Sequence, residues 1–292
     1  MKNVVVGLWL LVAILMGGCG DAASIPTASP TGERSPEEAA AYGGFHPGSR
    51  VEEGQIVMPL TFVDGSSAEA VAPGDLGVQH MSAAIYTAGG LEGVDRTIDF
   101  RYEDGSAFMD QGPLESYRGS EAAVEMWIPV PDMPAGCPNL VYRFGEWFVA
   151  VRTCQSELGP AERREWARSL EGRVTDDGFL VLSAIEPLQL EQAGGHDGPE
   201  LILGMDRANW IELEPGECDP AMLPDEGDIR TMPDGTSVSF SRLGGADSKI
   251  ENNWTATWCE DGLVWVQVIE AYRDFAEAAA ETFRLRDVVL AP

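Results

Sequence analysis

Six Asp-Gly dipeptides divide this 292-residue chain into short segments, and no other feature of the sequence constrains its fold as strongly. An Asp-Gly pair beside an alternating apolar run is a strong signal for a β-hairpin turn, because both residues accept the backbone angles that tight turns require. Examples are Asp64-Gly65 after the run 56–63 and Asp234-Gly235 after the run 229–232. Calcium loops also use Asp and Gly, but they need several carboxylates at alternating positions in one loop, and none of these segments has that density. The pattern therefore predicts short antiparallel strands.

The first half of the chain contains a hairpin whose register can be predicted. Apolar residues alternate on both sides of Gly145-Glu146: Leu140, Tyr142, Phe144, Trp147, Val149 and Val151. A two-residue turn with glycine first is typical of type II′, which places Phe144 opposite Trp147 and pairs the outer residues in step.

A helix is expected after this hairpin. Pro160 suits the first helical position, so the helix is predicted to begin at Gly159-Pro160 and to end at Gly172. The residues expected to be buried are Trp166, Ala167 and Leu170. A strand over 179–182 follows.

The C-terminal end repeats this order about 115 residues later. A hairpin is predicted from 255–258 and 263–269 around Asp261-Gly262. Asp274 is expected to cap the next helix, with Glu277 completing a capping box. One face of that helix carries Phe275, Ala279 and Phe283, and 287–290 form the closing strand. The repeated order of hairpin, helix and strand predicts an α+β, mainly antiparallel β fold of two similar domains.

The N-terminus has the features of an export signal. Lys2 precedes the apolar run 4–16, which is shorter than the roughly 20 residues that a membrane-spanning helix needs. The sequence Leu15-Met16-Gly17-Gly18-Cys19 follows, and it resembles the lipobox of bacterial lipoproteins. The resemblance implies that Cys19 receives a diacylglyceryl group and that the signal is cleaved before it. It also implies a location on the outer face of the cytoplasmic membrane. An ordinary cleaved signal is the alternative.

Composition gives the remaining boundaries. Residues 1–18 are the expected signal peptide, and 19–54, rich in small and polar residues, the lipid-anchored flexible tether. The polar stretch 191–200 is the best boundary between an N-terminal β-rich domain, 55–192, and a C-terminal one, 199–292.

The four cysteines after Cys19 predict two disulfides, because an even number is expected on the oxidising side of the membrane. Extending the register of the first hairpin places Cys137 opposite Cys154. Cys218 and Cys259 then pair by elimination. A metal site would need closely spaced cysteines, which the sequence lacks.

The charge of the chain limits its partners. It carries 48 acidic residues against 19 Lys and Arg, a formal net charge of −29. Such a field repels nucleic acids and anionic membrane surfaces, so no nucleic-acid partner is expected and the membrane is reached through the lipid. Arginine supplies nearly all the positive charge, with Lys2 and Lys249 the only lysines, which suggests a high-GC Gram-positive host. A salt-adapted host is the alternative explanation of the acidity.

No motif assigns a reaction, and neither a catalytic residue, a metal site nor a cofactor is predicted. His46 lies in the tether and His196 in the expected linker, which leaves His80 as the single histidine within a domain. We therefore expect a non-enzymatic binding module of the cell envelope, with an envelope protein or a glycan as partner. A hydrolase that uses paired carboxylates on glycans is the second hypothesis, and a solute-binding lipoprotein of an importer is the third. Three tryptophans near one hairpin could contact a glycan, but a core position is favoured for them: Trp254, Trp258 and Trp265.

Overall fold

The computed structural model describes the chain in segments. These are residues 48–78, 85–90, 97–101, 114–118, 123–127, 139–145, 147–152, 159–194, 198–204, 210–224, 227–242 and 253–292. The statements below concern these residues.

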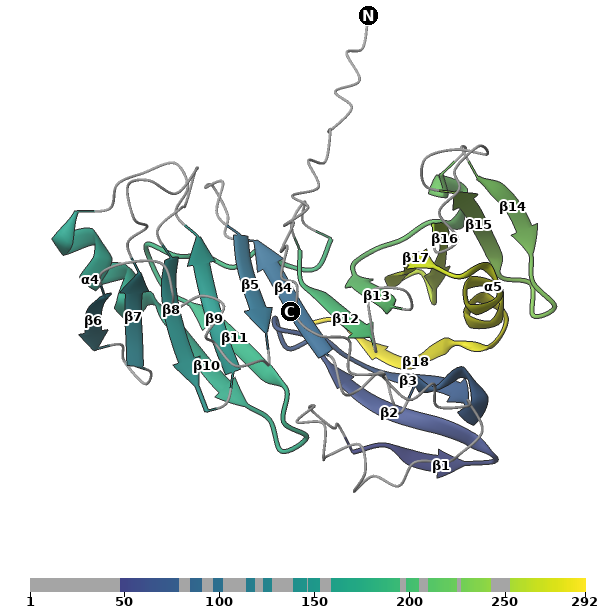
Figure 1. Cartoon of the computed structure of the whole chain (residues 1–292), viewed down its shortest axis with the longest axis horizontal. Coiled ribbons are helices and arrows are strands. Elements are labelled where there is room, and N and C mark those ends of the chain that lie inside the picture. The colour runs from purple at the N-terminus through teal and green to yellow at the C-terminus, as the bar shows by residue number, and fades with distance from the viewer. Residues whose placement is uncertain are drawn as a thin grey trace, which may run out of the picture. The chain divides into compact units, whose positions relative to one another are not determined.

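Antiparallel strands dominate the fold, as the turn pattern predicts. The largest sheet has twelve strands in the order β14-β15-β16-β17-β13-β12-β4-β5-β9-β8-β7-β6 (Figure 1). Their bounds are β4 Ile85–Gly90, β5 Thr97–Arg101, β6 Leu114–Arg118, β7 Ala123–Trp127, β8 Asn139–Phe144, β9 Trp147–Arg152, β12 Glu200–Gly204, β13 Trp210–Pro215, β14 Asp228–Thr231, β15 Ser237–Arg242, β16 Trp254–Glu260 and β17 Val264–Ala271.

Two smaller sheets complete the strand structure. The first has the order β1-β2-β3-β18, with bounds β1 Arg50–Glu52, β2 Gln55–Thr61, β3 Ser67–Pro73 and β18 Arg284–Val289. The second is the hairpin of β10 Leu170–Val174 and β11 Leu180–Ala184. In the described part of the chain the α-helices are α4 Pro160–Ser169 and α5 Arg273–Thr282, with short 3₁₀ turns at Gly74–Leu76 and Pro220–Met222. The fold is therefore α+β and mainly antiparallel β.

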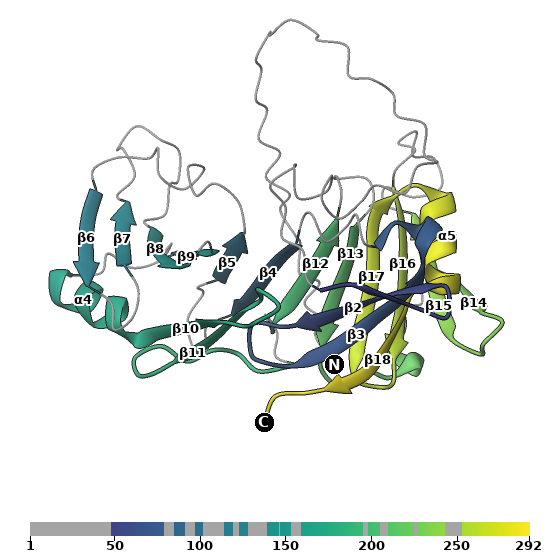
Figure 2. The same ribbon diagram turned by 90° about the horizontal axis from the view of Figure 1, so that it is seen from below.

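The hydrophobic core lies on one face of the large sheet. Ile211 and Leu213 of β13 and Val266 of β17 have no exposed surface, as the alternation of a half-buried strand requires. Met58 of β2 and Phe283 at the end of α5 belong to the same cluster. Figure 2 shows β2, β3 and β18 running across β12, β13 and β17. The small sheet and α5 thus lie on the core side of β12, β13 and β17.

Four of the Asp-Gly pairs lie in turns between paired strands, where the sequence predicted them. Gly65, Gly178 and Gly235 have φ angles of 94°, 88° and 95°. The remaining turn, between β16 and β17, has positive φ at both Asp261 and Gly262. The type of turn therefore explains why Gly follows Asp at each of these positions.

The register of the β8–β9 hairpin is confirmed: Phe144 pairs with Trp147 and Tyr142 with Val149. Its buried tyrosine is satisfied, because the Tyr142 hydroxyl donates to the carbonyl oxygen of Trp166 at 2.5 Å. This bond links the hairpin to α4.

The predicted end of the first helix is wrong. α4 ends at Ser169, and Leu170 is already extended. Gly172, expected to terminate the helix, lies in β10 beside the ring of Phe144, where an added Cβ would meet ring carbons at 2.6 Å. The glycine is explained by close packing in a strand and not by a helix end.

The predicted cap of the second helix is also wrong. Tyr272 is the N-cap of α5 and makes no side-chain capping bond, whereas Asp274 lies within the first turn. Glu277 is held instead by Arg230 and Arg273. Both arginines are better partners for its carboxylate than a backbone N–H that water can reach.

The two predicted domains are joined by strand pairing. β4, in the expected N-terminal domain, pairs with β12, and β3 pairs with β18 at the end of the chain. The expected division at 191–200 therefore runs between neighbouring strands of one sheet. The organisation into two similar domains stays a prediction.

Among the described residues, no helix combines the length and the apolar character that crossing a membrane would take. The expected signal sequence, Cys19 and the expected tether up to residue 47 lie outside these residues. The expectation of a flexible tether is wrong for its last residues, because Arg50–Glu52 form β1 and pair with β2.

Candidate functional site

A pocket of about 290 Å³ lies between the β14–β15 hairpin and α5. The hairpin and the helix supply all of its lining: Arg230, Thr231, Met232, Pro233, Phe240, Glu277 and Glu281. The ion pair that joins the two elements, Arg230 with Glu277, links residues 47 apart in the chain, so the pocket exists only once both have folded. We call it the hairpin–helix pocket.

The hairpin is shaped by its Asp-Gly turn. Met232 N–H donates to the Thr236 carbonyl at 2.8 Å, and the Asp234 carboxylate accepts the Thr236 N–H at 2.9 Å. These bonds fix the turn and place Met232 and Pro233 at one side of the pocket.

An ion-pair group centred on Arg230 closes one end of the pocket. Its guanidinium lies 2.8 Å from Asp228 and 2.9 Å from Glu277, and it stacks over Phe240 with 4.7 Å to the ring centroid. Arg273 also reaches Glu277, at 3.0 Å. Hydrogen bonds from Arg230 and then Arg273 hold the pKa of Glu277 below its usual value. Glu277 is therefore charged at neutral pH and fully engaged.

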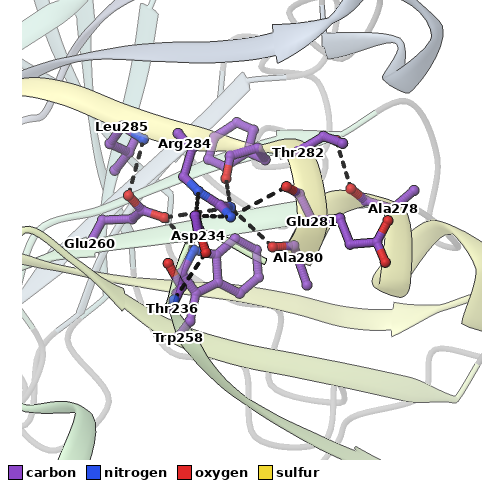
Figure 3. Close-up of polar contacts among 11 residues, drawn as sticks. Asp234, Thr236, Trp258, Glu260, Ala278, Ala280, Glu281, Thr282, Arg284 and Leu285 are labelled. Atoms are coloured by element: carbon purple, nitrogen blue, oxygen red, sulfur yellow. Dashed lines mark hydrogen bonds and ion pairs between the residues drawn. The ribbon is translucent and has the colours of Figure 1, made fainter. Parts of the chain in front are cut away.

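A second group, centred on Arg284, fastens the other end. The Arg284 Nε donates to Asp234 at 2.6 Å, and its Nη1 donates to the carbonyls of Ala280 at 3.0 Å and Phe283 at 2.6 Å (Figure 3). Arginine at a helix C-terminus satisfies carbonyls that have no partner within the helix. Burial raises the pKa of Asp234, but the Thr236 backbone bond and Arg284 outweigh it, so the pKa is lowered overall.

Glu260 lies behind Arg284 and is almost fully buried. The Trp258 Nε1 donates to its carboxylate at 2.6 Å, and Arg284 Nη1 is 4.0 Å away (Figure 3). Burial raises the pKa of Glu260 in spite of these partners. With its oxygens turned towards Trp258 and the backbone of Leu285, Glu260 joins β16 to β18. We assign it a structural role.

Glu281 is the carboxylate that remains available in the hairpin–helix pocket. No side-chain hydrogen bond or ion pair engages it within the described part of the chain, in contrast to Glu277 one turn earlier. Beside it lie Met232 and Phe240, with exposed fractions of 9% and 3%. An apolar wall with one free carboxylate suits a cationic group on an apolar stem, such as a lysine or arginine side chain.

The structure places some of the predicted site residues. Cys218 and Cys259 form a disulfide, with their Cα atoms 5.8 Å apart. Cys19, Cys137 and Cys154 lie outside the described residues, so the lipid anchor and the other disulfide stay predictions. His46, His80, His196 and Lys249 also lie outside them. No group of metal-ligating side chains is found where residues are described.

The tryptophans divide between the two faces of the large sheet. Trp258 is fully buried in the core, as predicted, and Trp254 packs against the core beneath Arg242 and Arg273. The predicted core position is wrong for Trp265, which points the other way because its neighbours Val264 and Val266 face the core.

Sequence reasoning missed the pocket residues, although a signal for them existed. Arg273, Glu277 and Glu281 follow one another at intervals of four along the helix, which places all three on one face. The sequence did not indicate which residues form the opposite wall of the pocket, because Arg230 and Phe240 come from a hairpin far away in the chain.

Comparisons with protein families, with curated proteins and with solved structures find no match to this chain.

Proposed function

We propose that this protein is a lipid-anchored binding module on the outer face of the cytoplasmic membrane, and that its hairpin–helix pocket docks a basic side chain of an envelope protein. The observation that carries the proposal is the uncommitted Glu281 carboxylate beside the apolar wall of Met232 and Phe240. The lipid on Cys19 and the expected tether between it and β1 hold the module at the membrane, as the lipobox resemblance implies.

The charge of the molecule supports a basic partner. A formal net charge of −29 attracts cationic surfaces and raises the rate at which they are encountered. The hairpin–helix pocket then provides local specificity. Ion pairs at Arg230 and Arg284 hold its two ends, so little rearrangement is needed on binding.

Calorimetric titration of the full chain in detergent tests the docking proposal. The probes are Nα-acetyl-lysine N-methylamide and its uncharged norleucine counterpart. We expect the lysine probe to bind about tenfold more tightly, and Glu281→Gln to remove most of that difference. Glu165→Gln changes an exposed carboxylate on α4 and is the matched control, with no effect expected. Equal binding of the two probes, or equal effects of the two substitutions, would refute the proposal.

A glycan-active hydrolase is the second candidate, and one observation favours it. Glu212 and Glu214 lie two residues apart on the same face of β13, and burial together with Glu214 raises the pKa of Glu212 to about 7. A protonated acid beside a carboxylate is the combination that glycosidases use. Release of reducing sugar from neutral polysaccharides, lost in both Glu212→Gln and Glu214→Gln, would establish this activity and end the binding-only proposal.

We also propose that the two halves of the fold are related units. Counted outward from the β4–β12 junction, the strands are β4-β5-β9-β8-β7-β6 on one side and β12-β13-β17-β16-β15-β14 on the other. The two lists match: in each, the first two strands in chain order are followed by the last four in reverse chain order. α4 follows β9 as α5 follows β17, and the strands after these helices pair with β11 and β3.

Hydrogen exchange tests this relation between the halves. Inner strands β9 and β17 should exchange their amides at similar slow rates, and the outer strands β6 and β14 at similar fast rates. Unrelated exchange patterns in the two halves would contradict it.

A further inference from the structure

The outward face of the large sheet carries a second group of residues suited to a ligand. Along β13, Ile211 and Leu213 face the core, so Trp210, Glu212 and Glu214 share the opposite face. By the same alternation, β17 presents three residues there: Trp265, Gln267 and Ile269. We call these six residues the outer-face group.

The register of β13 and β17 fixes how this group is arranged. Glu212 lies directly opposite Gln267, and Glu214 lies opposite Trp265. Trp210 lies opposite Ile269, at the other end. A carboxyl–carboxamide pair therefore occupies the centre, with one indole at each diagonal corner. Four residue steps separate the two indoles along the strands, or about 14 Å.

Two buried polar atoms at this face have no hydrogen-bond partner. They are Trp210 Nε1 and Thr255 Oγ1, the latter on β16 where the β16–β17 register shifts. They are the only such side-chain atoms found in the described part of the chain. Buried polar groups are almost always paired in folded proteins, so two orphans near one end of the outer-face group indicate a missing partner.

Apart from the carboxylate of Glu214, the polar groups of this face are uncharged or readily neutralised. Burial, with the nearby charge of Glu214, raises the pKa of Glu212 to about 7, so near neutral pH much of this group is a carboxylic acid that can donate and accept. Gln267 also donates and accepts, and the free indole N–H donates. Hydroxyl groups both donate and accept hydrogen bonds, so they can pair with all of these groups. An anion would instead be repelled by the carboxylate of Glu214 and by the strongly negative net charge of the molecule.

We propose that the outer-face group binds an uncharged saccharide, with sugar rings against Trp210 and Trp265 and hydroxyls on Glu212 and Gln267. Aromatic side chains offer flat apolar surfaces, and the central pair supplies the polar contacts that orient a ligand. This site is separate from the hairpin–helix pocket, so its success or failure is independent of docking at Glu281.

Titration calorimetry with neutral oligosaccharides tests the inference. The probes are hexamers of maltose, cellulose and chitin type, with hexagalacturonate as the anionic comparison. The full chain is kept in a detergent without a sugar head group, which would itself compete. We expect at least one neutral hexamer to bind and hexagalacturonate not to bind.

Four variants distinguish specific binding at the outer-face group from nonspecific binding to the protein surface. Trp265→Ala should weaken binding of that hexamer at least about tenfold, since an aromatic contact is lost. Glu212→Ala should weaken it similarly, whereas Glu212→Gln, which can still donate and accept, should stay within about threefold. Tyr272→Ala removes an exposed aromatic outside the outer-face group and should have no effect.

The inference is overturned if no neutral hexamer binds, or if Trp265→Ala and Tyr272→Ala have equal effects. Circular dichroism of each variant shows that it is folded. Glu281→Gln should leave saccharide binding unchanged, which separates this site from the proposed docking function.

Discussion

Residue 172 is a position where tertiary packing requires glycine, which has no Cβ. Because it follows a helical pattern, the sequence predicted that it ends the helix. The helix does stop nearby, at Ser169, but Gly172 itself lies in the next strand. The residue is glycine because Phe144 of β8 lies over the backbone of β10. That contact joins two segments distant in the chain, and no local pattern contains it.

Gly172→Ala is therefore expected to destabilise the fold by about 1 to 3 kcal/mol, because the new methyl group forces the Phe144 ring to move in a packed region. Gly74→Ala is the control: an added Cβ there meets no atom within 4 Å, and a change below about 0.5 kcal/mol is expected. Urea unfolding of both variants provides the measurement. Equal stability of the two would show that the Phe144 contact is not tight.

Glu212 makes a prediction about pH. Its pKa of about 7 lies above the ordinary 4.5, so between these values the folded chain holds a proton that the unfolded chain has lost. The stabilisation from this proton is complete below about pH 4.5 and is lost as the pH rises through about 7.

In Glu212→Gln, the fall in unfolding free energy between pH 5 and pH 8 should be smaller than in the wild type by on the order of 2 kcal/mol. Glu165→Gln should retain the wild-type slope. If Glu212→Gln also retains the wild-type slope, the Glu212 carboxyl group is not in a desolvated environment.

At the scale of elements, turns and hairpins were the most predictable parts. Asp-Gly pairs and alternating apolar residues marked four turns and the β8–β9 register correctly, because both signals act between residues close in sequence. Helix ends were less predictable, since tertiary partners decide them, as Arg230 does for Glu277. The pairing of β3 with β18 was not predictable, because the sequence around a strand does not indicate which distant strand it pairs with. The same limit hid the hairpin–helix pocket.

The Cys218–Cys259 disulfide ties the segment after β13 to the end of β16, across 41 residues. A cross-link over a loop of this length restricts the unfolded chain, and its removal in the double variant Cys218→Ser, Cys259→Ser should cost about 2 to 4 kcal/mol. Thermal unfolding with and without reductant is the measurement. A reductant effect that persists in the double variant belongs to the predicted Cys137–Cys154 bond, which non-reducing peptide mapping identifies directly. Mapping that links Cys154 to Cys218 instead would contradict both pairs.

At the scale of the whole molecule, the strand order joins what the sequence presented as two domains. The two hairpins predicted at an offset of about 115 residues, β8–β9 and β16–β17, both lie in the large sheet, and the relation between the two halves stays a proposal. Charge acts at this scale too, since a formal net charge of −29 disfavours anionic partners of the protein as a whole. The cellular location of the protein then decides which neutral or basic partners it can encounter. Both proposed sites can bind their envelope ligands only if the protein is exported.

The anchor at Cys19 is therefore the central claim. Growth of the native host with radiolabelled fatty acid, followed by isolation of the protein, tests it most directly. The account predicts that the wild-type chain takes up label and fractionates with membranes, and that Cys19→Ala takes up none and leaves the membrane fraction. A wild-type chain that takes up no label would contradict the lipid anchor, and with it the placement of the protein at the membrane surface.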